Sequence, residues 1–135
     1  MKKLKIGLLQ ISPCESLDGN LKKGLEFCKK AKDLECDIAL FPEMWSNGYR
    51  IYNRPVEVWK SEAVSQDSDF VGEFGNAARD LSMAIGSTLL EKHENNPRNS
   101  IVLFDRFGKK QFTYSKVHTC DFDVERNLTP GEEFY

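Results

Sequence analysis

The stretch that decides the fold is CDIALFPE, residues 36–43. Its first six residues form a short apolar run that Pro42 ends, a pattern typical of a buried strand. A similar run, LKIGLLQI, occupies residues 4–11 and also predicts a buried strand. Between the two runs, residues 17–34 predict an amphipathic helix, because lysines surround an apolar stripe of Leu21, Leu25, Cys28 and Leu34. Strand, helix and strand in this order predict a parallel β-α-β unit with a right-handed crossover.

Downstream of this unit, the pattern predicts a long connection, one helix and three further strands. Residues 42–68 lack clean periodicity, and long connections in compact domains are disproportionately functional. The other elements are predicted as a helix over residues 69–82 and strands over residues 83–90, 100–105 and 110–115. Gly108 suits a hairpin turn between the last two strands. The order is typical of an α/β domain with helices packed on a mixed sheet.

Length and composition narrow the class of protein. The 135 residues suit one globular domain, with 40% hydrophobic and 30% charged residues. The 19 basic and 21 acidic residues leave a net charge of −2, so no basic footprint for nucleic acid or anionic lipid is present. No apolar run approaches the ~20 residues that span a membrane. The apolar stretch after Met1-Lys2-Lys3 is broken by Lys5 and Gln10 and lacks a cleavage site, so we expect a cytoplasmic protein.

The cysteines and histidines form neither a metal-binding nor a disulfide pattern. The four cysteines are Cys14, Cys28, Cys36 and Cys120, and no two of them make a C-x-x-C pair. In a chain without a signal peptide this spacing favours free thiols. A zinc site needs four clustered ligands, but the sequence has only two histidines, so we expect no metal site. Cys28 and Cys36 are interpreted as small buried residues.

Two residues follow the ends of predicted strands, where ligand sites of α/β folds tend to lie. Glu43 comes two residues after the second strand, and Lys116 directly follows the last one. Each residue alone is more often solvated, and only the fold could bring the two together. A buried Glu–Lys pair would keep both groups charged, which suits a general base beside a cation.

Several motifs recur in a characteristic order along the whole chain. They are the first strand ending in Gln10, Asn20 at the start of the first helix, DIALFPE (residues 37–43) with Gly48-Tyr49, Asn99-Ser100 leading to Gly108, YSKVH (residues 114–118), and Glu125 followed by LTPG (residues 128–131). In this order and at these spacings, the chain resembles the N-terminal half of the nitrilase superfamily, the carbon–nitrogen hydrolases with a Glu-Lys-Cys triad.

The resemblance implies a fold, a reaction and a set of site residues. The fold would be the N-terminal part of a four-layer α-β-β-α sandwich. Glu43 would be the general base, Lys116 would stabilise the oxyanion, and Glu125 would be an auxiliary acidic residue that orients substrate and lysine. The substrate would be a small amide or carbamoyl compound, hydrolysed without metal or organic cofactor. Members of the family commonly associate as homo-oligomers, so the resemblance also implies a homo-oligomer.

The nucleophilic cysteine that the resemblance implies would lie beyond the next strand, outside residues 1–135. We therefore expect residues 1–135 to be a partial carbon–nitrogen hydrolase domain, truncated before that cysteine and inactive by itself. Cys120 is rejected as a substitute because its loop lacks the elbow and helix N-terminus that would lower a thiol pKa. The truncated sheet should expose apolar surface and an open edge.

Two other classes of protein compete with this interpretation. A nucleotide-binding domain would need a glycine-rich turn after the first strand, and residues 11–16 contain no glycine. The stronger alternative is a catalytically dead half-domain that acts at most as a partner-binding module. The two readings differ in whether the complete protein hydrolyses amides.

Overall fold

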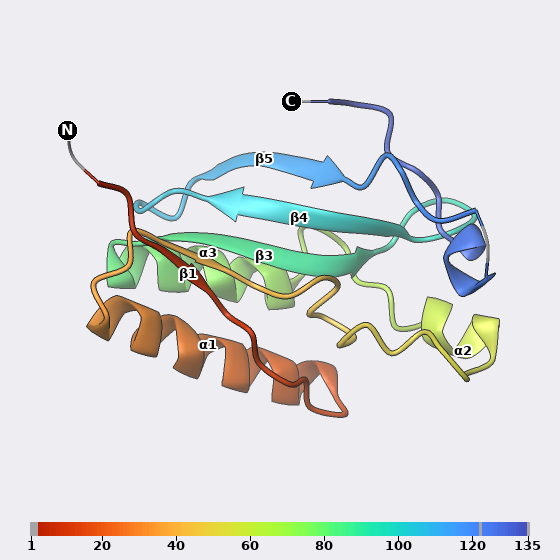
Figure 1. Ribbon diagram of the computed structural model, residues 1–135, viewed down its shortest axis with the longest axis horizontal. Helices are drawn as coiled ribbons and strands as arrows, with labels where there is room; N and C mark the ends of the chain where they lie inside the picture. The colour runs from red at the N-terminus through yellow and green to blue at the C-terminus, as the bar shows by residue number, and fades with distance from the viewer. Residues whose placement is uncertain (1–2, 122, 135) are drawn as a thin grey trace.

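The computed structural model describes residues 3–121 and 123–134 (Figure 1). In chain order its elements are β1 (Ile6–Leu8), α1 (Leu17–Asp33), β2 (Ile38–Leu40), α2 (Val56–Lys60), α3 (Asp69–Leu81), β3 (Ala84–Glu91), β4 (Arg98–Phe104), β5 (Lys110–Ser115) and the 3₁₀ helix η1 (Asp123–Asn127). Within this described part of the chain, no helix combines the length and apolar character that a membrane crossing requires.

The five strands form one mixed sheet in the order β1-β2-β3-β4-β5. β1 pairs with β2 and β2 with β3 in parallel, whereas β3–β4 and β4–β5 are antiparallel. The predicted β-α-β unit and the predicted mixed α/β fold are therefore confirmed. Gly108 lies in the β4–β5 turn with φ +76°, a left-handed conformation that favours glycine.

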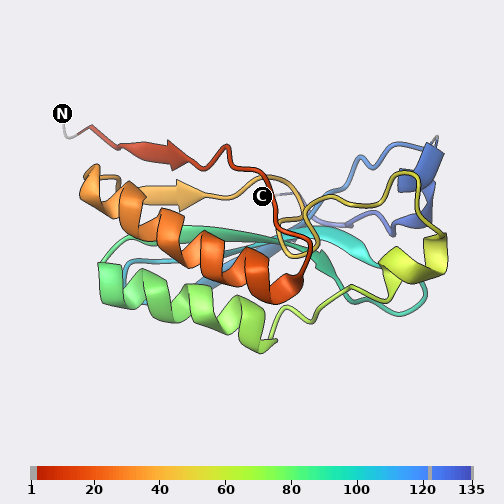
Figure 2. The same cartoon turned by 90° about the horizontal axis from the view of Figure 1, so that it is seen from below.

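Helices α1 and α3 lie side by side on one face of the sheet (Figures 1 and 2). Ser16 caps the N-terminus of α1, where its side chain accepts a hydrogen bond from the Gly19 N–H. The predicted helix is confirmed, but the predicted stripe is wrong in part, because Leu34 is 66% exposed. Of the predicted stripe, Cys28 is buried, and Leu21 and Leu25 are partly buried against the core; the other buried residues of α1 are Asn20, Gly24 and Ala31. These small side chains let α1 approach the aromatic core closely: a Cβ on Gly24 would lie 2.9 Å from Phe74.

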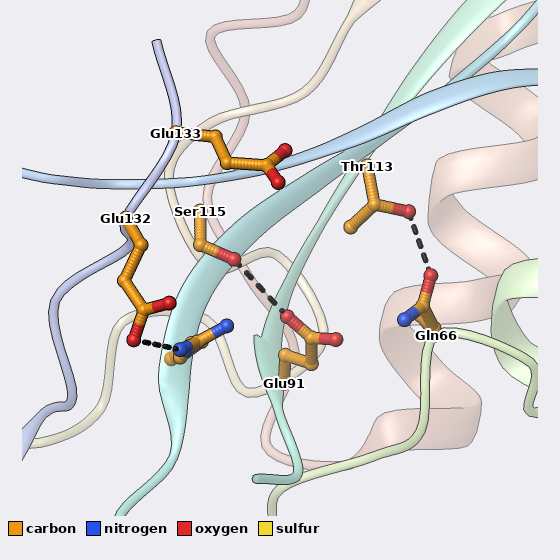
Figure 3. Close-up of a pocket in the computed structure, with 7 residues that line it drawn as sticks. Gln66, Glu91, Thr113, Ser115, Glu132 and Glu133 are labelled. Atoms are coloured by element: carbon orange, nitrogen blue, oxygen red, sulfur yellow. Dashed lines mark hydrogen bonds and ion pairs between the residues drawn. The ribbon is translucent and has the colours of Figure 1, made fainter.

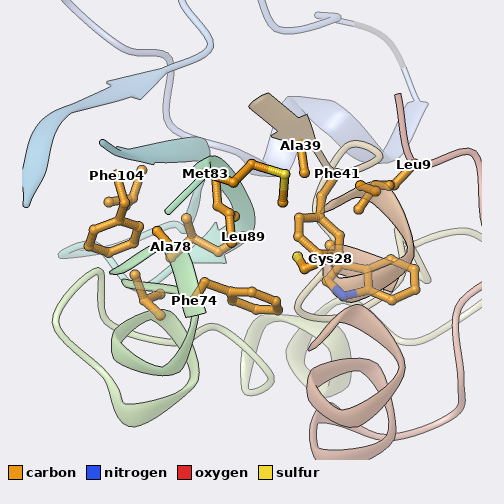
Figure 4. Close-up of a cluster of buried hydrophobic side chains, with 14 of the residues drawn as sticks. Leu9, Cys28, Ala39, Phe41, Phe74, Ala78, Met83, Leu89 and Phe104 are labelled. Atoms are coloured by element: carbon orange, nitrogen blue, oxygen red, sulfur yellow. The ribbon is translucent and has the colours of Figure 1, made fainter. Parts of the chain in front are cut away.

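The main core fills the space between the helices and the sheet (Figure 4). Phe41 packs against Trp45 and Phe74, with ring centroids 5.5 and 4.8 Å apart. Cys28 and Cys36 are buried, as predicted. Burial raises the pKa of Cys28 to about 12, so its thiol stays protonated. This core fixes the end of β2, from which the chain enters the Glu43 loop.

The sequence predicted a buried first strand, but the structure shows this strand to be largely exposed. β1 is an edge strand, and its Ile6 and Leu8 side chains are 48% and 67% exposed. The sheet face opposite the helices also remains open. A groove of about 460 Å³ on that face is lined by Ile38, Leu40, Ile101, Leu103, Phe112, Tyr114 and Phe134. An apolar run predicts a strand, but it does not reveal which of its faces other elements cover.

The connection over residues 42–68 is more ordered than its lack of periodicity suggested. It contains the short helix α2 and folds over a second, smaller core. That core consists of Met44, Ile51, Trp59, Leu90 and Leu128. The second core joins the loop after β2 to the segment after β5, which carries the remaining candidate site residues.

Candidate active site

The three candidate residues meet at one end of the sheet. Lys116 Nζ lies 2.9 Å from Glu43 Oε1 and 3.3 Å from Glu125 Oε2. Glu43 follows β2, Lys116 follows β5, and Glu125 lies in η1. The fold therefore brings together a lysine and two carboxylates from three separate elements.

Backbone hydrogen bonds on both sides hold Lys116. Its N–H donates to the Asn99 carbonyl at 2.8 Å, and its own carbonyl accepts the Gly131 N–H at 2.9 Å. Gly131 comes so close that a Cβ at this position would lie 2.2 Å from the Ser115 carbonyl oxygen. The glycine of the quoted LTPG motif thus has a physical reason: only glycine allows this contact with the end of β5.

The loop that carries Glu43 is fastened to β3. The Thr88 hydroxyl donates to the Pro42 carbonyl and accepts the Trp45 N–H at 3.1 Å. Ser46 Oγ accepts the Leu90 N–H at 2.9 Å. Side-chain bonds to β3 therefore hold the backbone on both sides of Glu43.

Asn20 and Trp45 tie helix α1 to the same loop. Trp45 Nε1 donates to the Asn20 carbonyl at 3.0 Å, and Asn20 Nδ2 donates to the Ser46 carbonyl at 3.3 Å. Asn20 is fully buried, so these bonds are shielded from water. The asparagine quoted at the start of the first helix thus helps to place the loop.

The two carboxylates differ in exposure and in hydrogen bonding. The side chain of Glu125 is 3% exposed, whereas that of Glu43 is 46% exposed. Glu125 accepts hydrogen bonds from the Tyr49 hydroxyl, from the Cys120 N–H at 3.0 Å and from Lys116. Burial alone would raise the pKa of Glu125, but these donors outweigh burial and hold the pKa below its usual range. Glu125 is therefore a fixed anion with both oxygens engaged.

The two carboxylates also keep Lys116 charged. Burial lowers the pKa of Lys116, but the hydrogen bonds and charges of Glu43 and Glu125 outweigh that effect and raise it above its usual value. Lys116 is therefore a cation at neutral pH, held between two anions.

Tyr49 is part of the same network. Burial raises the pKa of Tyr49, and its hydrogen bond to Glu125 raises it further. The phenol therefore remains a donor at neutral pH. Its partner carboxylate lies 76 positions away in the sequence.

Cys120 lies beside the site but lacks the surroundings of an activated thiol. Its N–H donates to Glu125, and burial and the Glu125 charge raise the pKa of its thiol. A nucleophilic cysteine needs the opposite shift. Over residues 3–121 and 123–134, no group of three or more His, Cys, Asp or Glu side chains could hold a metal ion.

A polar pocket of about 190 Å³ lies on the helix-facing side of the sheet, next to the end of β5 (Figure 3). In it the buried Glu91 carboxylate accepts hydrogen bonds from Ser100 Oγ at 2.5 Å and Ser115 Oγ at 3.3 Å. Successive residues of a strand point to opposite faces, so Ser115 in this pocket directs the next residue, Lys116, toward the candidate site.

Sequence reasoning did not assign a role to three residues around the site. The contacts of Tyr49, Thr88 and Asn99 span 76, 46 and 56 positions, respectively. Tyr49 and Asn99 occur in the motifs quoted from the sequence, and this was the only indication that they could belong to the site. Thr88 lies within an ordinary strand pattern and offered no signal.

The topology and geometry define an α/β domain with one mixed five-stranded sheet and a Glu-Lys-Glu cluster at one end of it. Comparisons with known proteins name the family. The sequence profile described as carbon–nitrogen hydrolase matches residues 5–135. The chain belongs to the carbon–nitrogen hydrolase family, as its motifs indicated.

Solved structures share the fold. An amidase from Nesterenkonia sp. AN1 in complex with acrylamide superposes with a TM-score of 0.79 at 20% identity, over 96% of this chain and 49% of the amidase. A carbon–nitrogen hydrolase from Helicobacter pylori G27 superposes with a TM-score of 0.80 at 22% identity, over 96% and 45%. At these identities the likeness establishes the fold alone.

A curated relative extends the comparison at the sequence level. A glutamine-dependent NAD(+) synthetase from Thermotoga maritima is 27% identical over 98% of this chain and 23% of its own length. The chain thus spans about half of the solved structures and about a quarter of the synthetase.

Proposed function

We propose that Glu43, Lys116 and Glu125 are the Glu–Lys part of a carbon–nitrogen hydrolase site whose substrate is a small amide or carbamoyl compound. The observation that carries this proposal is the position of Lys116 Nζ, 2.9 Å from one carboxylate and 3.3 Å from the other. A lysine kept charged in this way can stabilise negative charge that develops on a carbonyl oxygen. Acrylamide in the amidase from Nesterenkonia sp. AN1 supports the substrate class.

The two carboxylates suit different roles. Glu43 is the more exposed of the two and is the proposed general base. It takes the proton of a cysteine thiol, and the thiolate attacks the substrate carbonyl carbon while Lys116 stabilises the oxyanion. The C–N bond breaks as Glu43 returns the proton to the leaving nitrogen, which gives a thioester. Glu43 then takes a proton from water, and the resulting hydroxide attacks the thioester carbonyl. The C–S bond breaks, the acid is released, and Glu43 returns the proton to the thiolate.

The nucleophile is proposed to come from outside residues 1–135. Within the described residues, the four cysteines are Cys14, Cys28, Cys36 and Cys120. Only Cys120 contacts the Glu–Lys cluster, and burial and the Glu125 charge raise the pKa of its thiol. We propose that these residues are a partial domain and that the complete protein supplies the cysteine from a following segment. The 135 residues alone should then show no thiol-dependent ammonia release, and measured release would refute the partial-domain proposal.

The test is ammonia release by the complete protein from a panel of small amides and carbamoyl compounds. Glu43→Gln and Lys116→Met should each lower kcat by about 10²-fold or more. The matched controls are Glu73→Gln on the exposed face of α3 and Lys110→Met, whose lysine pairs with Asp67 on the surface. These controls should keep the wild-type rate. Wild-type turnover by Lys116→Met would exclude the proposed role of the lysine.

A second candidate function, a partner-binding module, is favoured by the open apolar groove. Its exposed side chains include Phe112 and Phe134, at 38% and 71% exposure. Apolar patches of this kind favour association with a protein surface. We accordingly propose that the protein self-associates through this groove. As a separate proposal, it works in the cytoplasm.

A further inference from the structure

Asn99 contacts both members of the candidate Glu–Lys pair. It is the second residue of β4 and is 7% exposed. Its backbone carbonyl accepts the Lys116 N–H at 2.8 Å, and its side-chain amide donates to Glu43 Oε1. One buried residue thus links two groups that come from different strands.

The hydrogen bond between the Asn99 side chain and Glu43 can form in only one direction, with Asn99 as the donor. An ionised carboxylate accepts hydrogen bonds and cannot donate them, so the NH₂ group of Asn99 must face Glu43. Lys116 Nζ donates to the same oxygen, Oε1, at 2.9 Å. Because two donors already engage Oε1, Oε2 is the oxygen that can take a proton without breaking either bond.

We infer that Asn99 is a positioning residue that orients the Glu43 carboxylate and presents Oε2 as its proton acceptor. The inference rests on the proposed function, in which Glu43 is a general base. Asn99 transfers no proton itself; its side-chain amide donor engages Oε1 of Glu43. An aspartate of the same shape would place a second carboxylate against Glu43, and a leucine would offer no donor.

The test is carboxyl ¹³C NMR of the 135-residue chain across pH, with the Glu43 signal assigned by its loss in Glu43→Gln. In Asn99→Leu the carboxyl should hold its proton about tenfold more tightly, because one hydrogen bond to the ionised form is lost. Ser100→Ala is the matched control, since it removes a side-chain bond from the next residue of β4 that goes to Glu91. The control should titrate like the wild type. An unchanged Glu43 titration in folded Asn99→Leu would overturn the inference.

A second measurement applies if Asn99→Leu does not fold. In the wild-type chain, the Asn99 side-chain amide signals should shift as Glu43 protonates. They should lose this response in Glu43→Gln and keep it in Glu125→Gln. A wild-type amide that does not respond would overturn the inference. Neither NMR measurement requires turnover. The NMR results therefore test the role of Asn99, and the ammonia assay separately tests the proposed hydrolase function.

Discussion

At the residue scale, surroundings distinguish two chemically identical carboxylates. Glu125 is buried and accepts hydrogen bonds from a hydroxyl, a backbone N–H and a lysine, whereas almost half of the Glu43 side chain is exposed. Lys116 lies between them and holds them at fixed positions. A buried, saturated carboxylate can set the charge of the site, and an open one can exchange a proton.

The network around Glu125 makes stability depend on pH in acid. In the unfolded chain a glutamate pKa is about 4.3. Burial would raise the folded value, but the hydrogen bonds from Tyr49, Cys120 and Lys116 hold the pKa of Glu125 below it. The folded chain therefore binds fewer protons than the unfolded chain between the two values. The stability from Glu125 is present above about pH 4.3 and is lost as pH falls through the folded pKa.

Glu125→Gln should remove this contribution. At pH 7 we expect the free energy of unfolding in urea to fall by about 2 kcal/mol, because hydrogen bonds to a buried charge are lost. Below pH 4 the difference from the wild type should shrink. Glu73→Gln, at an exposed glutamate of α3, is the control and should follow the wild-type curve. A constant difference between Glu125→Gln and the wild type from pH 3 to 7 would contradict the explanation.

At the element scale, local patterns predicted the long elements well. α3 ends one residue earlier than predicted, and β5 has the predicted bounds. α2 was missed because five residues are too few to show a period. The prediction that β1 is buried was wrong. Burial of a strand depends on the strands and helices that lie beside it, and these come from distant parts of the sequence.

The segment after η1 gives a prediction for Gly131, with Gly72 of α3 as the control. Gly131→Ala should destabilise the chain by about 2 kcal/mol or more, because its Cβ would lie 2.2 Å from the Ser115 carbonyl oxygen. Gly72→Ala is the matched control, since no atom lies within 4 Å of a Cβ on this exposed residue of α3. It should stabilise the helix by about 0.5–1 kcal/mol. Urea unfolding measures both, and equal effects would contradict the close approach at Gly131.

At the scale of the whole molecule, the sheet is covered on one face and open on the other (Figure 2). Glu43 and Lys116 could be predicted as site residues because each follows a strand, but their contact depends on the arrangement of all five strands. Glu125 was predicted only through the resemblance, because η1 has no pattern that links it to β5. The positioning of Asn99 required the antiparallel register of β3, β4 and β5, which no local pattern specifies.

The open face should make the chain associate. We expect the 135-residue chain to bind a hydrophobic dye and to sediment as more than a monomer. Phe112→Ser, in the groove, should reduce both effects. Phe107→Ser is the matched control, because Phe107 is 75% exposed in the β4–β5 turn and does not line the groove. A monomeric wild type without dye binding would contradict this expectation.

The central claim is that residues 1–135 supply the Glu–Lys part of a hydrolase site and that a cysteine elsewhere in the complete protein is the nucleophile. The most direct test is peptide mass spectrometry after acid quenching of the complete protein with a small amide. We predict an acyl group on a cysteine outside residues 1–135, absent in Glu43→Gln and Lys116→Met. Acylation of Cys120, or the same adduct in both variants, would contradict the claim.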